Sequence, residues 1–534
     1  MSPHQLRVPS STGISRIDPS KPVKHTLHTS DTRELKYGDT IQFHGHLGVW
    51  DEDSVPEGVV LRWRKQGDPL CDGAIPQLAS APNGSNPSSD LLTNLEDFVR
   101  VSVAEKDSDS TSACHEFWKS ISEPPPQDLC LTDEQFERAR NLYLDHTVQI
   151  SQAFLYYALG GGFASPRIVR TLEAVSYLVP SKPGAISPAA NDRTYRRLLE
   201  TLQFVLDVMR CSVPDQVSST KGATHLMPHG EGWKSCVRVR MLHGTVRAKL
   251  RRKKPWNGDG SDEEDCPISQ EDMSATLAGF STIPLWTLTA LGLTASSKDA
   301  EAFLALWRHV GFYMGVSPDI LRRYWSTAQV ADQFLSSMLI HVYAPLHPGD
   351  KGLVNAPTMP ILIASANRPP TYNTLEWNCA VTHSLLGCEL ATYLKVPEPT
   401  WDAKLKLRVM LIVQAFPVLF TRYYGGLLRN GWLEKKRWAY AVNIALTLRR
   451  SLGNRRTKFR PGGQEGAFGK LQWEDESIPE HKDKHMARKA NWALYQVMGE
   501  MLAVLVGCGG ATALLMWKAY PFMVHYYFGL KTRI

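Results

Sequence analysis

The chain has 534 residues, of which 43% are hydrophobic and 21% are charged. This composition is ordinary for a globular protein, and the length allows a large hydrophobic core. The formal charge of +7 arises from 60 basic and 53 acidic residues, and no arginine tract is present. We therefore do not expect nucleic acid to be a partner.

The nine cysteines are scattered, and no two have the C-x-x-C spacing. The sequence therefore contains neither a zinc-knuckle motif nor a site for covalently attached c-type haem. Scattered cysteines in odd number are typical of a reducing compartment. We expect an intracellular protein that is cytoplasmic or associated with the endoplasmic-reticulum membrane.

The first part of the chain is the least regular. Residues 1–60 are predicted to form a polar, partly disordered extension without a secretory signal. The β-branched and aromatic residues in "LKYGDTIQFHGHLGVW" (35–50) and "GVVLRWRK" (58–65) favour a short hairpin. Turn-rich breaks at 81–90 and 122–127 are predicted to separate this N-terminal part from the rest of the chain.

Helical periodicity dominates from Thr132 onward. Thr132 and Gln135 form a capping-box pattern, and the glycines at 160–162 are predicted to end the helical run that begins there. Further helices are predicted at 166–179, 191–210, 233–252, 270–292, 298–314, 327–343, 372–395, 402–428, 431–452 and 486–517. The predicted fold class is therefore all-α, with a single large helical domain.

The C-terminal region contains an apolar run without charged residues at 501–517, which lies between Glu500 and Lys518. Its 17 residues are close to the lower limit for crossing a bilayer, and a buried terminal helix explains the run about as well. Residues 481–534 are therefore interpreted as an apolar helix that is a possible membrane anchor.

One helix carries a histidine between two arginines. In "RVRMLHGTVR" (238–247), Arg240, His243 and Arg247 lie on one helical stripe. A neutral imidazole can bind haem iron, and guanidinium groups can pair with the haem propionates. Spacing alone favours a satisfied core or surface histidine over a ligand.

A second polar pair lies one helix earlier. Arg197 and Thr201 are four residues apart and share a helical face among leucines and valines. The alternative is that Arg197 pairs with Glu200 and that Thr201 bonds back to its own turn. The residues alone favour this alternative.

Five segments in order resemble one family, the latex-clearing rubber oxygenases and the fungal endoplasmic-reticulum-bound oxygenase of mycophenolic acid biosynthesis. "RVRMLHGTVR" resembles the R-x-x-H-x-x-x-R motif of this family, and "RRLLET" (196–201) is similar to its R-x-x-x-T segment. "LRWRKQGDPLCDG" (61–73), "CPISQEDMSATLAGFSTIPL" (266–285) and "LWRHVGFYMGVSPDIL" (306–321) continue the likeness. It covers residues 60 to 330 and extends loosely beyond them.

The resemblance implies a globin-like helical domain over residues 61–480 that binds one haem b. His243 would be the iron ligand, Arg240 and Arg247 would support the cofactor, and Arg197 and Thr201 would lie close to it. The implied reaction is the cleavage of a carbon–carbon double bond by dioxygen in an apolar, isoprenoid-like substrate. The cofactor would supply the oxygen chemistry, and the protein would supply an apolar, water-excluding channel.

One position departs from the family. The rubber oxygenases have a lysine immediately before the threonine, where it can cap the iron, whereas this chain has Glu200. We include Glu200 among the expected catalytic residues and do not expect a lysine-capped closed state. Two other functions stay open: a haem sensor or storage protein without turnover, and a membrane-associated helical interaction protein.

Overall fold

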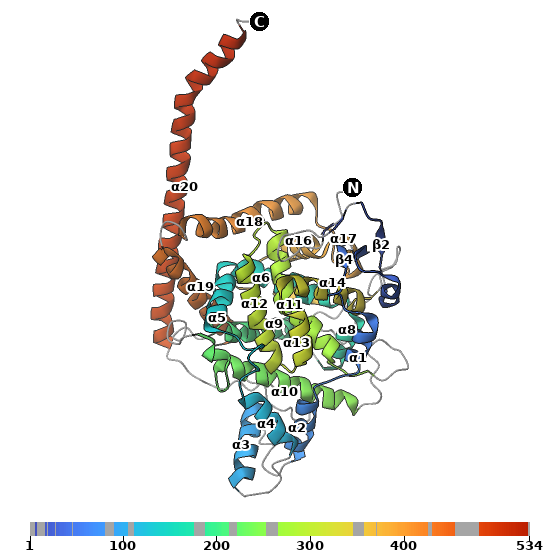
Figure 1. The fold of residues 1–534 in the computed structure, drawn as a ribbon. Helices are drawn as coiled ribbons and strands as arrows, with labels where there is room; N and C mark the ends of the chain where they lie inside the picture. Colours follow the sequence, from blue (N-terminus) through green and yellow to red (C-terminus); the bar gives the residue numbers. More distant parts are fainter. Residues whose placement is uncertain are drawn as a thin grey trace.

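The computed structural model describes residues 6–7, 17–18, 20–26, 28–44, 46–80, 90–104, 112–175, 187–212, 222–252, 265–344, 357–369, 371–425, 430–453 and 480–531. Helices account for most of these residues, so the predicted all-α class is confirmed (Figure 1). Part of the N-terminal segment 1–60 and the loop 253–264 lie outside the described residues.

A small sheet forms in the N-terminal region. Its strands, in the order β1-β4-β3-β2, are β1 (Leu6–Arg7), β2 (Val23–His25), β3 (Asp39–Phe43) and β4 (His46–Trp50). β3 and β4 are antiparallel, with Phe43 opposite His46, and the two outer pairings are parallel. The predicted hairpin is therefore confirmed only for its first segment, 35–50, which contains both paired strands. The second predicted strand is wrong, because Glu57–Arg64 forms helix α1.

Three more helices follow before residue 123. They are α2 (Pro69–Ser80), α3 (Leu91–Ala104) and α4 (Ala113–Ser122). The prediction that this part is separate from the rest of the chain is wrong, because α2 and α3 pack against α10 (Glu231–Arg251). The physical reason is a set of long-range ion pairs, for example between Arg238 and Asp90 at 2.8 Å.

The remaining helices form the body of the protein around one large core. They are α5 (Asp133–Asp145), α6 (Thr147–Gln152), α7 (Gly160–Gly162), α8 (Pro166–Val175), α9 (Pro188–Val208), α11 (Gln270–Ala290), α12 (Ser297–Tyr313), α13 (Pro318–Tyr324), α14 (Ala328–Val342), α15 (Thr358–Ser365), α16 (Leu375–Leu386), α17 (Cys388–Tyr393), α18 (Trp401–Phe420) and α19 (Asn430–Ser451). Four tryptophans are almost fully buried in this core: Trp233, Trp286, Trp307 and Trp325.

Local signals in the sequence explain where several helices begin and end. The Thr132 side chain accepts a bond from the Gln135 N–H, so the predicted capping box is confirmed. The predicted helix 372–395 is divided into α16 and α17 at Gly387, whose φ is +80°. At Gly161, a Cβ atom would lie 2.8 Å from Leu386 Cδ2, so a larger residue there would require the leucine side chain to shift.

The C-terminal helix α20 (Glu480–Lys531) is longer than predicted. Its first part packs against α19, and its second part projects away from the body (Figure 1). Within the part of the chain that the structure describes, no helix has an apolar stretch that is long enough to cross a membrane.

Candidate functional site

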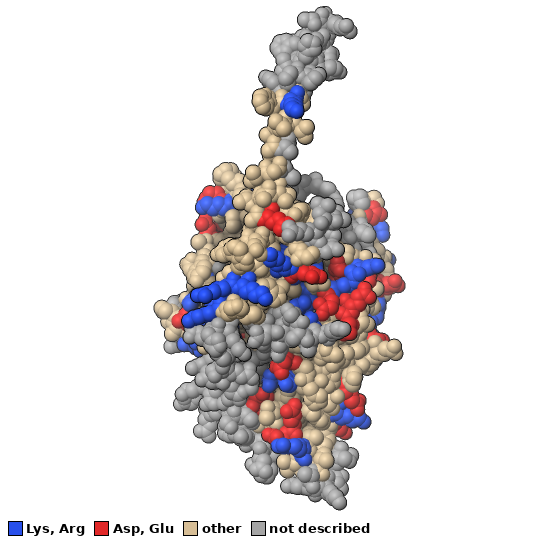
Figure 2. All heavy atoms as spheres, turned by 90° about the vertical axis from the view of Figure 1, so that its left-hand side faces the viewer, with Lys and Arg blue, Asp and Glu red and all other residues tan. Residues whose placement is uncertain are grey.

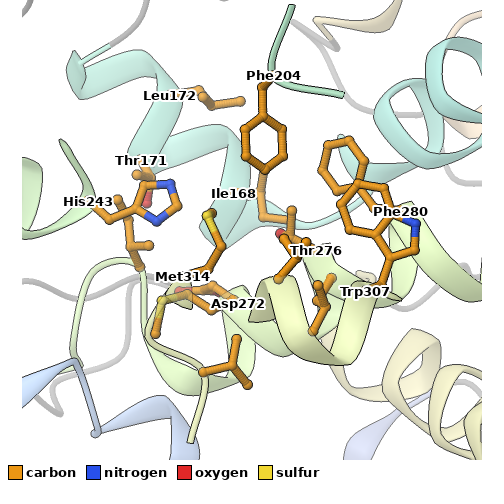
Figure 3. A pocket seen from close by; sticks show the side chains of 15 residues that line it. Ile168, Thr171, Leu172, Phe204, His243, Asp272, Thr276, Phe280, Trp307 and Met314 are labelled. Carbon is orange, nitrogen blue, oxygen red and sulfur yellow. The ribbon is translucent and has the colours of Figure 1, made fainter. Parts of the chain in front are cut away.

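A cavity of about 210 Å³ lies between α8, α9, α10, α11 and α12. Figure 3 shows its lining, which is mostly apolar and aromatic. The polar side chains in the lining are Thr171, His243, Asp272 and Thr276. A largely apolar pocket with a few polar groups is the usual form of a small-molecule site.

His243 is contributed by α10, and its ring points into this cavity (Figure 3). Its Nδ1 atom is buried and has no hydrogen-bond partner among the described residues. Burial, followed by the positive charges of Arg247 and Arg197, lowers the pKa of His243 to about 3. The imidazole is therefore neutral at physiological pH, which is the form that can donate a lone pair to a metal.

The two arginines that flank His243 in the sequence bind carboxylates of the protein. Arg240 makes two hydrogen bonds to Asp68, Nε to Oδ2 at 2.6 Å and Nη2 to Oδ1 at 2.9 Å. Arg247 donates from Nε to Asp72 Oδ1 at 2.6 Å. These pairs attach α10 to the start of α2, so the arginines hold the histidine helix in place. Their predicted contact with a cofactor stays a prediction.

Close backbone packing supports the same helix. A Cβ atom at Gly244 would lie 2.6 Å from Cys71 Sγ and 3.1 Å from Ile75 Cγ1. The residue after His243 must therefore be glycine for α10 to approach α2 this closely. The Arg240 guanidinium also lies over the Phe117 ring, 5.1 Å from its centroid.

The three predicted catalytic residues of α9 do not line the cavity. Arg197 forms an ion pair with Glu200 at 2.7 Å, and the Thr201 hydroxyl donates to the Arg197 carbonyl at 3.3 Å. Glu200 is buried and Thr201 is exposed. The structure thus has the Arg197–Glu200 ion pair and the Thr201 hydrogen bond to its own turn, which is the alternative that the sequence pattern favoured. Arg197 still lies near enough to His243 to influence its pKa.

Asp272 is a cavity residue that the sequence reasoning missed. It is the third residue of α11, where its carboxylate accepts from the Ser269 N–H at 2.9 Å as part of a capping box. Arg167 of α8 donates to the same carboxylate, from Nη2 to Oδ2 at 3.3 Å. The sequence pattern that could have drawn attention to Asp272 is S-x-x-D at 269–272. This pattern predicts a helix cap and gives no indication of a cavity residue.

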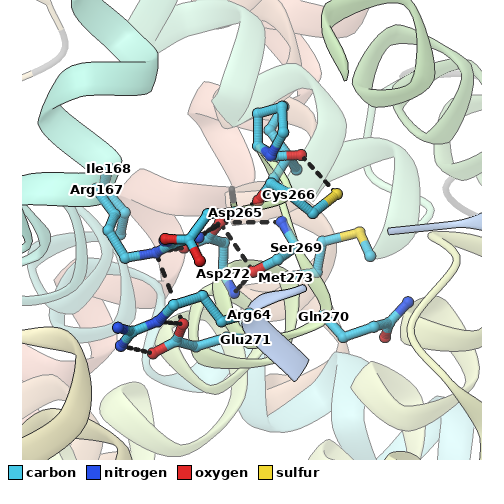
Figure 4. Close-up of polar contacts among 12 residues, drawn as sticks. Arg64, Arg167, Ile168, Asp265, Cys266, Ser269, Gln270, Glu271, Asp272 and Met273 are labelled. Carbon is cyan, nitrogen blue, oxygen red and sulfur yellow. Dashed lines mark hydrogen bonds and ion pairs between the residues drawn. The ribbon is translucent and has the colours of Figure 1, made fainter. Parts of the chain in front are cut away.

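Arg167 belongs to a buried network of charges behind the cavity (Figure 4). It also pairs with Asp265, and Arg64 makes two hydrogen bonds of 2.8 and 2.9 Å to Glu271. Burial raises the pKa of Glu271, and the nearby arginines oppose that rise. Two arginines thus pair with three carboxylates, and the network fixes α1, α8 and α11 relative to one another.

Aromatic rings form the wall that lies away from His243. Phe280 and Trp307 are stacked, with centroids 5.1 Å apart and an interplanar angle of 26°. Phe204 lies 6.3 Å from the Phe280 centroid in an edge-on arrangement. Figure 3 shows these three rings across the cavity from the imidazole. The cavity thus has one polar nitrogen-bearing side and one aromatic side.

Two other buried histidines, His309 and His341, are hydrogen-bonded to the backbone of the core. His309 accepts from the Leu131 N–H at 3.2 Å and lies 3.1 Å from the Leu226 carbonyl, and His341 lies 2.8 Å from the Val55 carbonyl. His44 and His46 are buried in the β3–β4 hairpin. Among the described residues, no cluster of three or more His, Cys, Asp or Glu side chains could hold a metal ion.

The comparisons with known proteins agree on one family. Residues 164–416 match the family model described as "ER-bound oxygenase mpaB/B'/Rubber oxygenase, catalytic domain". The rubber oxygenase of Streptomyces sp. (strain K30) is 26% identical over 208 residues, which cover 39% of this chain and 43% of that protein. The chain therefore spans less than half the length of this curated relative.

The solved structure of latex clearing protein LCP in the closed state aligns with a TM-score of 0.44 and 18% sequence identity. That alignment covers 62% of this chain and 79% of the LCP chain. Every residue that lines the cavity falls within the matched range 164–416. The family predicted from "RVRMLHGTVR" and "RRLLET" is thus confirmed for residues 164–416, which match the catalytic domain of the mpaB and rubber oxygenases.

Proposed function

We propose that the chain is a haem b-dependent oxygenase that cleaves a carbon–carbon double bond in an apolar, isoprenoid-like substrate. The observation that carries this proposal is His243: a neutral imidazole, whose Nδ1 has no hydrogen-bond partner among the described residues, points into an apolar cavity inside the family's catalytic domain. A single histidine from a helix is a sufficient protein ligand for haem iron.

The residues present fit such a cofactor. The low pKa of His243 leaves its lone pair free for iron at neutral pH, and Arg240 and Arg247 fix the helix that presents it. Nδ1 has no described partner, so the orientation of the ring depends on packing and on the two ion pairs rather than on a hydrogen bond. When bound, the haem would supply the activation of dioxygen.

The rest of the lining defines what the chain itself contributes. Phe204, Phe280 and Trp307 provide a rigid apolar wall that can hold a hydrocarbon chain and exclude water. Thr171 and Thr276 are the neutral polar side chains that reach the same space. This arrangement favours a substrate with little polar surface, because the cavity offers few hydrogen-bond partners.

Activity can be tested with purified, haem-reconstituted protein and two apolar probes, squalene and farnesol. We expect oxygen consumption and new aldehyde and ketone products, identified by mass spectrometry, and we expect the His243→Ala variant to form none. A haem-containing protein that forms no product from either probe would contradict the oxygenase proposal and favour a sensor or storage role. The motive for this second role is position 200. The rubber oxygenases have a lysine there, whereas this chain has Glu200, which pairs with Arg197.

A further inference from the structure

Helix α18 presents an apolar stripe to solvent. The α18 stripe consists of Trp401, Leu405, Val409, Ile412 and Val413, whose spacing of three and four residues places them along one face. Trp401 is 77% exposed and Ile412 is 70% exposed. The opposite face, with Ala403 and Leu407, is buried against the body. The helix is thus apolar on both faces.

Cations flank the α18 stripe on both sides. With 100° per residue, Lys404 and Arg408 lie along one edge and Lys406 along the other. Lys404 pairs with Glu398 at 2.9 Å, and Lys406 pairs with Asp402 at 3.4 Å, all at the surface. Basic residues that border an apolar helical face are typical of helices that lie in a lipid headgroup region.

A second apolar surface lies on α20. Its residues 502–517, here called the α20 segment, contain no Asp, Glu, Lys or Arg. Large side chains of this segment are strongly exposed, among them Leu502 at 61%, Val506 at 67% and Trp517 at 74%. Figure 2 shows charged side chains gathered on the body, whereas the described side chains of the emerging helix are tan apart from one blue residue.

A small core fixes the place where α20 leaves the body. Phe420 at the end of α18, Trp432 of α19, and Val497 and Met501 of α20 pack together there. The Tyr424 hydroxyl donates to Glu500 Oε1 at 2.6 Å beside this core. In Figure 1, α18 crosses the top of the body, and α20 rises past its end toward the same side.

We propose that the α18 stripe and the α20 segment together bind a phospholipid bilayer that contains anionic lipids. α18 would lie in the interface, with its cations at headgroup level and its stripe among the acyl chains. The α20 segment is about 24 Å long at 1.5 Å per residue. It can therefore enter a hydrocarbon core of about 30 Å beside α18 without spanning it. This proposal does not depend on the proposed enzymatic function.

The test is co-sedimentation of the full-length protein with vesicles of phosphatidylcholine, with and without phosphatidylserine. The wild type should bind both, and more strongly with phosphatidylserine. Leu405→Glu, Val409→Glu and Ile412→Glu combined should lower the partition coefficient at least about tenfold, because charges are costly among acyl chains. Leu502→Glu with Val506→Glu should also lower it.

The matched control is Val101→Glu with Val103→Glu, since both valines are exposed on α3, far from α18 and α20 (Figure 1). This control should bind vesicles like the wild type. Lys404→Gln, Lys406→Gln and Arg408→Gln combined should remove the preference for phosphatidylserine and leave binding to phosphatidylcholine unchanged. Circular dichroism of each variant checks that the helices are retained.

Three results would overturn the proposal. The wild type could remain in the supernatant with both kinds of vesicle. The α18 glutamate variant could bind like the α3 control. Alternatively, sedimentation velocity without lipid could show a dimer that the α18 glutamate substitutions dissociate, which would assign the surface to a second copy of the chain.

Discussion

Arg247 of α10 donates from Nε to Asp72 Oδ1 of α2 at 2.6 Å, across 175 positions of the sequence. Together with the Arg240–Asp68 pair, it fixes the helix that presents His243 to the cavity. Arg247 is fully buried, and Asp72 is 15% exposed, so both charges depend on their pairing. The position of the candidate iron ligand is therefore determined by two aspartates that precede it by more than 160 positions in the sequence.

The Arg247–Asp72 pair should be essential for stability. Arg247→Ala would leave Asp72 with only its exposed partner Arg251, so we expect the free energy of unfolding to fall by about 3–5 kcal/mol. Urea denaturation followed by circular dichroism measures this. Arg100→Ala is the control, because its pair with Asp97 is exposed and should contribute less than about 1 kcal/mol. Equal effects of the two substitutions would contradict the prediction.

A side chain at Gly244 should destabilise the packing of α10 against α2. Gly244→Ala places a methyl group against Cys71 Sγ and Ile75 Cγ1, and such overpacking costs about 1–3 kcal/mol. Gly431→Ala is the matched control, since no atom lies within 4 Å of its Cβ position and alanine is the better helix former. Thermal unfolding should show a lower midpoint for the first variant only. A midpoint for Gly244→Ala that equals or exceeds that of the control would disprove this.

The long helices could be predicted from the sequence because hydrophobic periodicity and caps are local. The helix at Glu57–Arg64 could not, since its valines and tryptophan favour a strand and packing in the fold overrides that preference. His243 could be selected from its motif, and its ring lies in the cavity lining, whereas the partners of Arg240 and Arg247 could not be predicted. No local spacing relates α10 to Asp68 and Asp72, which lie more than 160 residues away.

Glu200 should depend on Arg197. Glu200 is buried, and its Oε1 atom has no hydrogen-bond partner among the described residues, whereas Oε2 pairs with Arg197. Arg197→Met should lower the free energy of unfolding by about 1–3 kcal/mol, because it leaves a buried carboxylate without its cation. Glu200→Gln in the Arg197→Met background should restore most of the loss. A double-mutant cycle with no coupling between the two positions would refute this dependence.

Stability should fall as pH decreases below about 6.5. Burial lowers the pKa of His309 to about 4 and that of His243 to about 3, so the folded state binds fewer protons than the unfolded state between these values and 6.5. Each such histidine adds a slope of up to about 1.4 kcal/mol per pH unit in this window. Urea denaturation at a series of pH values measures the slope.

His309→Gln supplies the matched variant for this pH dependence. It should be less stable than the wild type at neutral pH, because His309 bonds to Leu131 and Leu226. The free energy of unfolding of this variant should nevertheless decrease less steeply with falling pH. The slope should be smaller by the contribution of one titrating group, because the variant lacks one buried histidine that takes up a proton on unfolding. If the wild type were equally stable across the window, or if the variant had the same slope, the neutral buried state of these histidines would be wrong.

The central claim is that His243 is the protein ligand of a haem iron. The most direct measurement is the absorption spectrum of purified protein after reconstitution with haem, reduced and with carbon monoxide, for the wild type, His243→Ala and the surface control His485→Ala. We predict a Soret band for the wild type and the control, and its loss in a His243→Ala protein that retains its circular dichroism. A folded wild type that binds no haem, or an unchanged Soret band in His243→Ala, would contradict the claim.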